Sequence, residues 1–438
     1  MGDSPDVDFL IAGAGILGVS LAYWLTTLYD CSVAIADLAG TAGAHTSSRN
    51  TGVIHRPYYL DPQKKRVFAR TSLLSYRMWE GLAASAGLPW RRAGTFNIAL
   101  EESEVRTLEE YGRWGIENGM DESELELMDG KGVKAREPEV SCRAGLHSKS
   151  DVSVDFGAFT RHVWTLLLAR GAKFLGRRKV VAATAEGGKT EVRFSGDGGM
   201  TSIRCRFLLN AAGGGALAIA KMAGFAREYA MLNFRGEYWV VDEPYASRVS
   251  TNIYRPPRFP QYPFLDPHFV VRADGERQIG PNAVIVPGPY VYSGAGLPNA
   301  LSYLERPLLP KVSLLTDRDF VAMAAAEWRS SLSKDAMCNR VRKFVPGLVA
   351  STLNRRAVFG VRCSIVDRGG FVPEALLFKG DRSAHIINYN SPGATGAPAY
   401  SALVVEELRR EGLLPALKER RGGAAISGWD YESVVSRF

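Results

Sequence analysis

The first forty residues alternate between short apolar runs and breaks of glycine or polar residues. Residues 8–12 (Asp-Phe-Leu-Ile-Ala) form an apolar run stopped by glycines, which is typical of a buried parallel strand. Residues 16–29 carry the longer apolar pattern of a helix, and 32–36 form a second apolar run that ends at Asp37. The chain is therefore predicted to open with a strand–helix–strand unit.

The same two patterns continue along the chain. Apolar residues at helical spacing predict helices over 62–84, 102–118, 154–170 and 319–344. Short apolar runs predict strands at 95–100, 179–183, 190–194, 206–210, 357–365 and 385–388, and a hairpin over 269–280. A glycine-rich loop over 391–397 leads into a last helix through Arg410, and 406–421 is expected to be a basic helical surface. The mixture indicates the α/β class.

Gly13, Gly15 and Gly18 have the spacing G-x-G-x-x-G where the first strand meets the helix. In this context the first glycine allows a tight turn, the second lets the backbone approach a pyrophosphate, and the third lets helix and strand pack closely. Asp37 ends the second strand, where a carboxylate bonds ribose hydroxyls and disfavours the 2′-phosphate of NADP. The spacing alone leaves FAD and NAD open, and the alternative is a glycine-rich turn without a ligand.

Composition narrows the class of protein. With 438 residues, 46% of them apolar and 23% charged, the chain is a folded protein too long for a single core, so two lobes are expected. The net charge of +8 comes without a Lys/Arg tract interleaved with aromatics, which argues against nucleic acid. A solvated basic surface is the favoured interpretation, and an anionic substrate or an anionic membrane surface are the alternatives. Neither the five cysteines nor the six histidines have metal-ligand spacing, so no metal site is expected.

The N-terminal pattern bears on localisation. The first seven residues are acidic and lack the basic region of a signal peptide. The longest apolar stretch breaks at Thr26-Thr27, too early to span a bilayer. We expect a cytoplasmic protein, with peripheral contact to the inner face of the membrane as an open alternative.

One segment points to a family. Residues 45–55 (His-Thr-Ser-Ser-Arg-Asn-Thr-Gly-Val-Ile-His) resemble the second flavin motif of the D-amino-acid oxidase superfamily, and more narrowly of its L-2-hydroxyglutarate dehydrogenase/oxidase branch. Similar segments follow in the same order at 210–213, 234–238, 280–283, 360–362 and 388–395. The resemblance implies a Rossmann-type FAD-binding lobe and a second, mainly antiparallel β-sheet (α+β) substrate lobe. We assign 1–85, 151–230 and 346–425 to a discontinuous FAD-binding domain, and 86–150 and 231–345 to the substrate domain.

The resemblance also implies an activity, the FAD-dependent oxidation of a small anionic 2-hydroxy acid such as L-2-hydroxyglutarate by hydride transfer to the flavin. Two segments depart from the branch: Arg56-Pro57 follows the motif histidine, and 372–375 (Val-Pro-Glu-Ala) replaces an acidic pair. Within the superfamily, the alternative is an amine or amino-acid oxidase of the glycine/sarcosine oxidase kind. Outside it, the alternative is a non-catalytic nucleotide-binding protein. Oxygen, a quinone and an electron-transfer protein all stay open as electron acceptors.

Two residues are the candidates for catalysis. His55 is the candidate general base, because an imidazole titrates near neutral pH. Arg362 is the candidate anchor for the substrate carboxylate, because a guanidinium pairs with a carboxylate through two hydrogen bonds. The alternatives are a core histidine and an arginine paired with an internal acid. Tyr254, Arg255 and His268 are the candidate substrate contacts.

The remaining candidates surround the cofactor. His45 is a hydrogen-bonding neighbour of the flavin ring or a covalent attachment point. The expected FAD contacts are Gly13, Gly15, Ile16, Leu17, Gly18, Asp37, Leu38, His45, Thr46, Ser47, Ser48, Asn50, Thr51, Val181, Ala212, Gly213, Gly360, Arg362, Pro392, Gly393, Ala394, Thr395 and Gly396.

Overall fold

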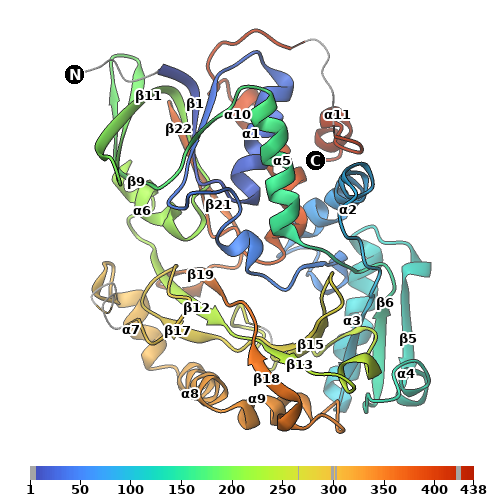
Figure 1. Ribbon diagram of the computed structural model, residues 1–438. Helices are drawn as coiled ribbons and strands as arrows, with labels where there is room; N and C mark the ends of the chain where they lie inside the picture. Colours follow the sequence, from blue (N-terminus) through green and yellow to red (C-terminus); the bar gives the residue numbers. More distant parts are fainter. Residues whose placement is uncertain (1–5, 265, 297–299, 301–302, 421–425) are drawn as a thin grey trace.

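The computed structural model describes residues 6–264, 266–296, 300, 303–420 and 426–438 (Figure 1). Its first large sheet has the strand order β21-β22-β11-β1-β2-β8, with the β9–β10 hairpin attached to β11. The strands from β22 to β8 run parallel, and β21 is an antiparallel edge. The strands are β1 Asp6–Ala12, β2 Val33–Ala36, β8 Lys173–Leu175, β9 Arg178–Glu186, β10 Lys189–Gly196, β11 Gly199–Asn210, β21 Leu376–Gly380 and β22 Ser383–Ile387.

Side chains along β1 alternate between two cores, as the period of a strand requires. Phe9 and Ile11 pack among the helices α1 (Ile16–Leu28), α5 (Phe156–Ala169) and α10 (Gly393–Arg410), which lie together on one face of the sheet (Figure 1). Leu10 and Ala12 point to the other face, towards the β9–β10 hairpin and α6 (Ala216–Met222). Helix α2 (Arg66–Ala86) packs along α10. The parallel strands are therefore buried on both sides, which explains their continuous apolar sequences.

The second large sheet has the order β18-β13-β16-β15-β14-β4-β6-β5 and is antiparallel except where β14 pairs with β4. Helices α4 and α9 contribute to its core, and α3 packs against β4, β5 and β6. The elements are α3 Glu102–Glu117, α4 Gly130–Arg136, α9 Lys334–Val341, β4 Thr95–Ala99, β5 Leu125–Asp129, β6 Ala144–Ser148, β13 Trp239–Val241, β14 Asn252–Tyr254, β15 His268–Val271, β16 Arg277–Gly280 and β18 Leu353–Arg356. Strand β18 belongs to this sheet although the sequence places it within the 346–425 segment of the other lobe.

A small antiparallel sheet, β17-β12-β19-β20, lies between the two larger ones in Figure 1. It places Arg362 on β19 directly opposite Phe234 on β12. The strands β3 and β7 form a separate two-stranded antiparallel ladder, which pairs residues 53–54 with residues 152–153. The remaining elements are β3 Val53–Ile54, β7 Val152–Ser153, β12 Ala230–Gly236, β17 Val284–Val286, β19 Gly360–Asp367, β20 Gly370–Phe371, α7 Leu309–Leu315, α8 Arg318–Leu332 and α11 Tyr431–Val435.

The segments 234–238 and 280–283 meet at a buried ion-pair network centred on Glu237, which is 1% exposed. Its carboxylate accepts two hydrogen bonds from Arg235, at 2.7 and 2.9 Å, and one from Arg356 at 3.0 Å. Asn282 donates to the same carboxylate at 3.1 Å and accepts the backbone N–H of Glu237 at 2.9 Å. These motif residues therefore hold β12 against β18, the strand that carries Arg356.

The α/β fold expected from the sequence is confirmed, and the opening strand–helix–strand unit matches within one or two residues. Several expected elements differ in their bounds: α2 begins at Arg66, β11 begins at Gly199 and β19 begins at Gly360. Three other differences have a clear position in the chain. The helix over 319–344 is interrupted at Ser333, whose hydroxyl caps the next helix by accepting the Ala336 N–H. The loop over 391–397 is already helical from Gly393. The basic helix over 406–421 ends at Arg410, and Arg421 lies outside the described residues.

Candidate active site

The three fingerprint glycines lie where β1 turns into α1, and each has a separate steric reason. Gly13 has φ of +105°, and a Cβ there would lie 2.4 Å from the carbonyl oxygen of Ala211. A Cβ on Gly18 would lie 1.9 Å from the Gly13 carbonyl oxygen, so α1 packs directly on the turn. Gly15 is the N-cap of α1 and has no side chain to cap the helix. The first N–H groups of α1 are thus directed towards this turn, as an anionic ligand requires.

Two side chains complete this turn. Asp37 accepts the Ala14 N–H through Oδ2 and the Ala39 N–H through Oδ1, both at 2.7 Å. Ser47 accepts the Ile16 N–H at 2.9 Å, which brings the 45–55 segment onto the N-terminus of α1. The two sequence motifs, distant along the chain, therefore form one cradle.

His45 lies at the edge of this cradle in a cluster of aromatic side chains. Its Nε2 is 4.0 Å from Asp37 Oδ1 and has no hydrogen-bond partner among the described residues. Its Nδ1 is 2.9 Å from the Tyr292 hydroxyl, and its ring is 4.6 Å from that of Tyr290. Arg49 lies over Tyr292 at 4.2 Å. None of Tyr290, Tyr292 and Arg49 was predicted as a site residue. Arg49 lies within the 45–55 segment, and the only local signal for the other two was a pair of tyrosines in a stretch rich in glycine and proline.

The N-terminus of α10 approaches the same region from the C-terminal part of the chain. Its N-cap, Pro392, makes no side-chain cap, and its first turn contains no acidic residue. A Cβ on Gly396 would lie 2.6 Å from the Thr71 hydroxyl, so this glycine permits close packing on α2. Thr395 accepts the His55 N–H and donates to the Val53 carbonyl, both at 3.4 Å, which ties α10 to β3.

His55 follows β3 and is buried, with 11% of its side chain exposed. Its Nδ1 is 2.9 Å from Oδ2 of Asp151, a carboxylate that is entirely buried. The imidazole also contacts the rings of Tyr59 and Tyr254 edge-on, at 5.7 and 5.4 Å. The sequence analysis did not single out Asp151, which lies 96 residues from His55 along the chain.

Tyr254 and His268 stack face to face, with their ring centroids 3.9 Å apart. His268 donates from Nδ1 to the Asp266 carbonyl at 3.1 Å, because a carbonyl can only accept, and this leaves a lone pair on Nε2. Burial lowers the pKa of His268 to about 3, so its imidazole is neutral. The Nε2 atom and the Tyr254 hydroxyl are both buried without a partner among the described residues. Such orphaned polar atoms indicate a ligand.

Arg362 lies across the same cluster. Its guanidinium donates to the Pro263 carbonyl, and no Asp or Glu among the described residues forms an ion pair with it. Burial lowers the pKa of Arg362, and Tyr238 and Tyr59 oppose that shift. Tyr59 therefore interacts electrostatically with Arg362 and contacts the His55 ring. The cation and the imidazole predicted from sequence belong to one cluster of side chains.

The segment 372–375, which departs from the family pattern, also lies near Arg362. Lys65 interacts electrostatically with both Glu374 and Arg362, and its Nζ donates to the Pro373 carbonyl at 2.5 Å. Burial raises the pKa of Glu374 to about 7, although Lys65 opposes the shift. Oε1 of Glu374 is buried without a partner among the described residues. Near Arg362, this protein therefore has one acidic residue, Glu374, next to Lys65, where the family pattern has an acidic pair.

Other candidate arginines are engaged within the protein. Arg255 pairs with Glu104 on α3 at 2.6 Å. Arg56 pairs with Glu124 at 2.8 Å and lies over the Tyr76 ring at 4.5 Å. Their charges are therefore largely neutralised by these partners, in contrast to Arg362.

Some of the other expected FAD contacts hold the backbone of the cradle, and the rest are described by the element on which they lie. Asn50 donates to the Thr46 and Ser47 carbonyls at 3.0 Å, and Ser48 donates to the His45 carbonyl at 3.2 Å. Gly360 lies against the backbone of Arg49, where a Cβ would meet the carbonyl oxygen at 1.9 Å. Ile16 and Leu17 begin α1, Leu38 follows Asp37, Thr51 precedes β3, Val181 lies on β9, Ala212 and Gly213 follow β11, and Pro392, Gly393 and Ala394 begin α10.

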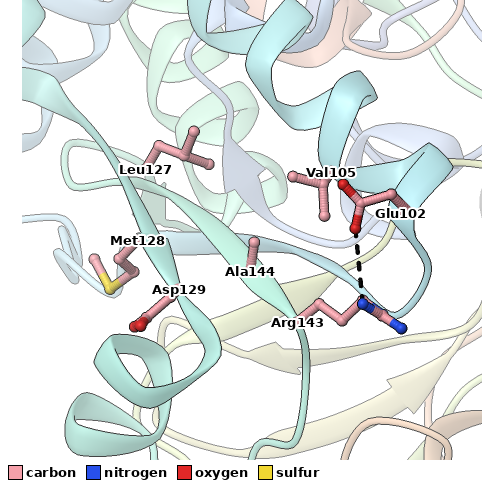
Figure 2. A pocket seen from close by; sticks show the side chains of 7 residues that line it. All are labelled: Glu102, Val105, Leu127, Met128, Asp129, Arg143 and Ala144. Carbon is pink, nitrogen blue, oxygen red and sulfur yellow. Dashed lines mark ion pairs between the residues drawn. The ribbon is translucent and has the colours of Figure 1, made fainter.

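A different hollow lies on the outside of the second lobe. Figure 2 shows it between α3 and the strands β5 and β6, with an ion pair of 3.7 Å between Glu102 and Arg143. Its volume is 460 Å³, and its lining is Glu102, Val105, Leu127, Met128, Asp129, Arg143 and Ala144. It contains none of the residues predicted for cofactor or substrate.

The fold and the cradle define a class, the FAD-binding oxidoreductases built on two lobes. The chain belongs to the family described as FAD dependent oxidoreductase (DAO), which it matches over residues 8–407.

Within this family, the chain is similar to several curated proteins and solved structures. The chain is 25% identical to the mitochondrial L-2-hydroxyglutarate dehydrogenase of Nematostella vectensis, over 92% of this chain and 91% of that protein. It is 26% identical to the L-2-hydroxyglutarate dehydrogenase of Escherichia coli strain K12, over 92% and 93%. Among solved structures it is similar to the L-alpha-glycerophosphate oxidase of Mycoplasma pneumoniae with FAD bound, with a TM-score of 0.72, 19% identity, and coverage of 97% of this chain and 98% of that one.

The chemistry of the cradle fits FAD. Neither α1 nor α10 is capped by the side chain of its own N-cap residue, so both helix N-termini can receive anionic or polar edges of the cofactor, and glycine backbone permits its close approach. The orphaned Nε2 of His45 adds a polar atom at the rim. In the part of the chain that the structure describes, no helix is long and apolar enough to cross a membrane, and no group of His, Cys, Asp and Glu side chains is arranged to hold a metal ion.

Proposed function

We propose that this enzyme oxidises a small 2-hydroxy acid of the L-2-hydroxyglutarate type to the 2-oxo acid. The observation that carries the proposal is the cluster in which Tyr59 contacts the His55 ring and interacts electrostatically with Arg362, while Arg362 has no acidic partner among the described residues. Arg362 is half-buried, and a guanidinium withdrawn from water without a carboxylate partner is costly, so an anionic substrate would supply the missing partner. Relatives named L-2-hydroxyglutarate dehydrogenase, matched over most of the chain, support this substrate class.

In this proposal, Gly13, Gly15, Asp37 and Ser47 hold the cofactor at the N-terminus of α1, and the start of α10 holds it from the other side. Bound FAD would supply the acceptor for the hydride that leaves the substrate carbon. Arg362 binds the substrate carboxylate and sets the orientation of the carbon–hydrogen bond. His55 receives the hydroxyl proton at Nε2, because its Nδ1 is already bonded to Asp151.

The second candidate is the oxidation of an amine or amino acid. A neutral amine has no hydroxyl proton to lose and does not require the buried imidazole–carboxylate pair of His55 and Asp151. The pair therefore favours the hydroxy acid.

Anaerobic bleaching of the flavin tests the proposed function. Purified protein is expected to be yellow and to release FAD in acid, and L-2-hydroxyglutarate is expected to bleach the flavin faster than its D enantiomer or any amino acid of a panel. Faster bleaching by glycine, sarcosine or a D-amino acid would contradict the proposed hydroxy acid substrate and support the oxidation of an amine or amino acid instead. A protein that cannot be reconstituted with FAD would contradict the cofactor assignment.

Asp37 provides a test of the cradle. Asp37→Ala is expected to weaken FAD binding by about tenfold or more, since it removes a charged hydrogen-bond acceptor from the expected ribose site and from the Ala14 and Ala39 N–H groups. The measurement is the dissociation constant of FAD for apoprotein, followed by fluorescence quenching. Asp30→Ala, an exposed acid outside the cradle, is the control. Equal FAD affinity in the two variants would remove Asp37 from the site.

Membrane contact and location stay proposals from sequence. The net charge of +8 favours weak binding to an anionic membrane surface, although Arg409 and Arg410 are both paired with Glu406. We expect co-sedimentation with anionic vesicles at low salt and release at high salt, and failure to co-sediment at low salt would contradict it. A location in the cytoplasm is likewise a prediction, and the electron acceptor stays open.

A further inference from the structure

Asp151 is a buried carboxylate whose two oxygens have separate partners. Oδ1 accepts the backbone N–H of Arg56 at 2.9 Å and the hydroxyl of Ser148 at 2.7 Å. Oδ2 faces His55 Nδ1 at 2.9 Å. The side chain has no exposed surface, and among the described residues no Lys or Arg side chain forms an ion pair with it. The acid is therefore held in place through one oxygen and directs the other at the imidazole.

The surroundings of this pair are neutral or already neutralised. Rings of Tyr59, Tyr254 and His268 face His55, and Tyr58 and Tyr76 lie near Asp151. The guanidinium of Arg56 is directed at Glu124. Because no Lys or Arg of the described residues pairs with Asp151, its negative charge is directed at His55, where it stabilises positive charge in a buried site in which such interactions are strong.

The geometry also determines which nitrogen of His55 carries the proton. A carboxylate can only accept, so Nδ1 donates to Oδ2 and Nε2 retains its lone pair. The ring is further constrained because Arg56, the next residue, is bonded to the same carboxylate through its backbone. His55 is thereby presented in the tautomer that a general base needs.

We propose that Asp151 is a positioning residue for the reaction, acting through His55 by fixing its tautomer and by stabilising the imidazolium that forms when the substrate hydroxyl loses its proton. This inference rests on the proposed function, in which His55 is the base. In this proposal Asp151 does not contact the substrate and acts only through His55.

Asp151→Asn is the most informative variant, because it preserves the shape of the side chain and reverses the direction of the hydrogen bond with His55 Nδ1. The two donors to Oδ1 keep the amide oxygen on their side, so the amide NH₂ faces His55 Nδ1. Nδ1 must then accept, the proton moves to Nε2, and the base loses its lone pair. Ser148→Ala is the matched control, since it removes one hydrogen bond from Oδ1 and leaves the His55 contact in place.

The experiment compares FAD-loaded wild type with Asp151→Asn, Ser148→Ala and His55→Gln by stopped-flow flavin reduction with L-2-hydroxyglutarate under anaerobic conditions. Asp151→Asn and His55→Gln are each expected to lower the limiting rate by about a hundredfold or more, with KM within about threefold and FAD content unchanged. Ser148→Ala is expected to stay within about fivefold. A near-normal rate in Asp151→Asn with a large loss in His55→Gln would overturn the inference and leave the proposed function standing. A near-normal rate in His55→Gln would reject His55 as the base, and the inference with it.

Chemical rescue separates positioning from a structural role. Formate is small enough for the space that Asp151→Ala leaves, and it is expected to raise the rate of that variant at least about tenfold while leaving His55→Gln unchanged. Wild type with formate serves as the control for competition at Arg362. A folded, FAD-loaded Asp151→Ala that formate does not rescue would overturn the inference. Failure of both Asp151 variants to hold FAD would do the same, by assigning Asp151 to the structure alone.

Discussion

Replacing Arg362 with alanine is expected to lower kcat/KM for the best hydroxy acid by about a hundredfold or more, which corresponds to about 3 kcal/mol of transition-state stabilisation. The guanidinium has no acidic partner among the described residues, so its deletion removes the expected contact to the substrate carboxylate without leaving a buried acid unpaired. Arg362→Lys keeps the charge and loses the planar pair of donors, so it is expected to raise KM and retain part of the turnover. Steady-state kinetics of both variants provide the measurement.

The control for Arg362 is Arg258→Ala, an exposed arginine near Pro263 in sequence that is expected to change kcat/KM less than about twofold. FAD content of all variants should equal that of wild type. If Arg362→Ala loses FAD or unfolds, the residue has a structural role. Unchanged catalysis would mean that the carboxylate is bound elsewhere, and Lys65, which interacts electrostatically with Arg362, would be the next residue to test.

Replacing Glu237 with glutamine is expected to lower the free energy of unfolding by about 3–5 kcal/mol. The glutamine cannot neutralise Arg235, which is itself buried, so an uncompensated charge would remain in the core. Urea denaturation of wild type and Glu237→Gln, each saturated with FAD, measures the difference. Glu276→Gln is the matched control, because Glu276 pairs with the exposed Arg355 and is expected to contribute less than about 1 kcal/mol.

The contribution of Glu237 has a defined pH dependence. Burial acts to raise the pKa of Glu237, but hydrogen bonds from Ser331, Asn282 and Arg235 hold it below its ordinary value in the folded protein. Its stabilising effect is therefore fully present above the ordinary pKa of a glutamate and is lost as the pH falls through the lowered pKa. The stability difference between wild type and Glu237→Gln should narrow in that acidic range. A difference below about 1 kcal/mol at neutral pH would contradict the central role of this network.

The sequence alone determined the local parts of the molecule. The opening strand–helix–strand unit could be predicted because its apolar runs are continuous and its glycines are close together in the chain, so the pattern is visible within about 30 residues although β1 also pairs with the distant β11. The family could also be recognised from ordered segments, and the family match over residues 8–407 confirms it. The glycine-rich segment at 391–397 was predicted to be a loop, because glycine is a weak helix former, although the helix α10 already begins at Gly393. Only its packing on Thr71 and Tyr389 shows why a helix there requires glycine.

Tertiary structure decided which charged side chains have a partner. The sequence near Arg255 and Arg362 does not show which of them has an acidic partner, yet the fold gives Arg255 the carboxylate of Glu104 and gives Arg362 no acidic partner within the described residues. The pairing of His55 with Asp151 likewise spans 96 residues and depends on the β3–β7 ladder that brings their segments together. The apolar pattern of a sequence shows which face of an element is buried, because apolar residues recur about once per turn on the buried face of a helix and at every second residue of a strand. A single hydrogen bond between distant segments, such as that between His55 and Asp151, produces no repeating pattern in the sequence, so only the folded structure shows it.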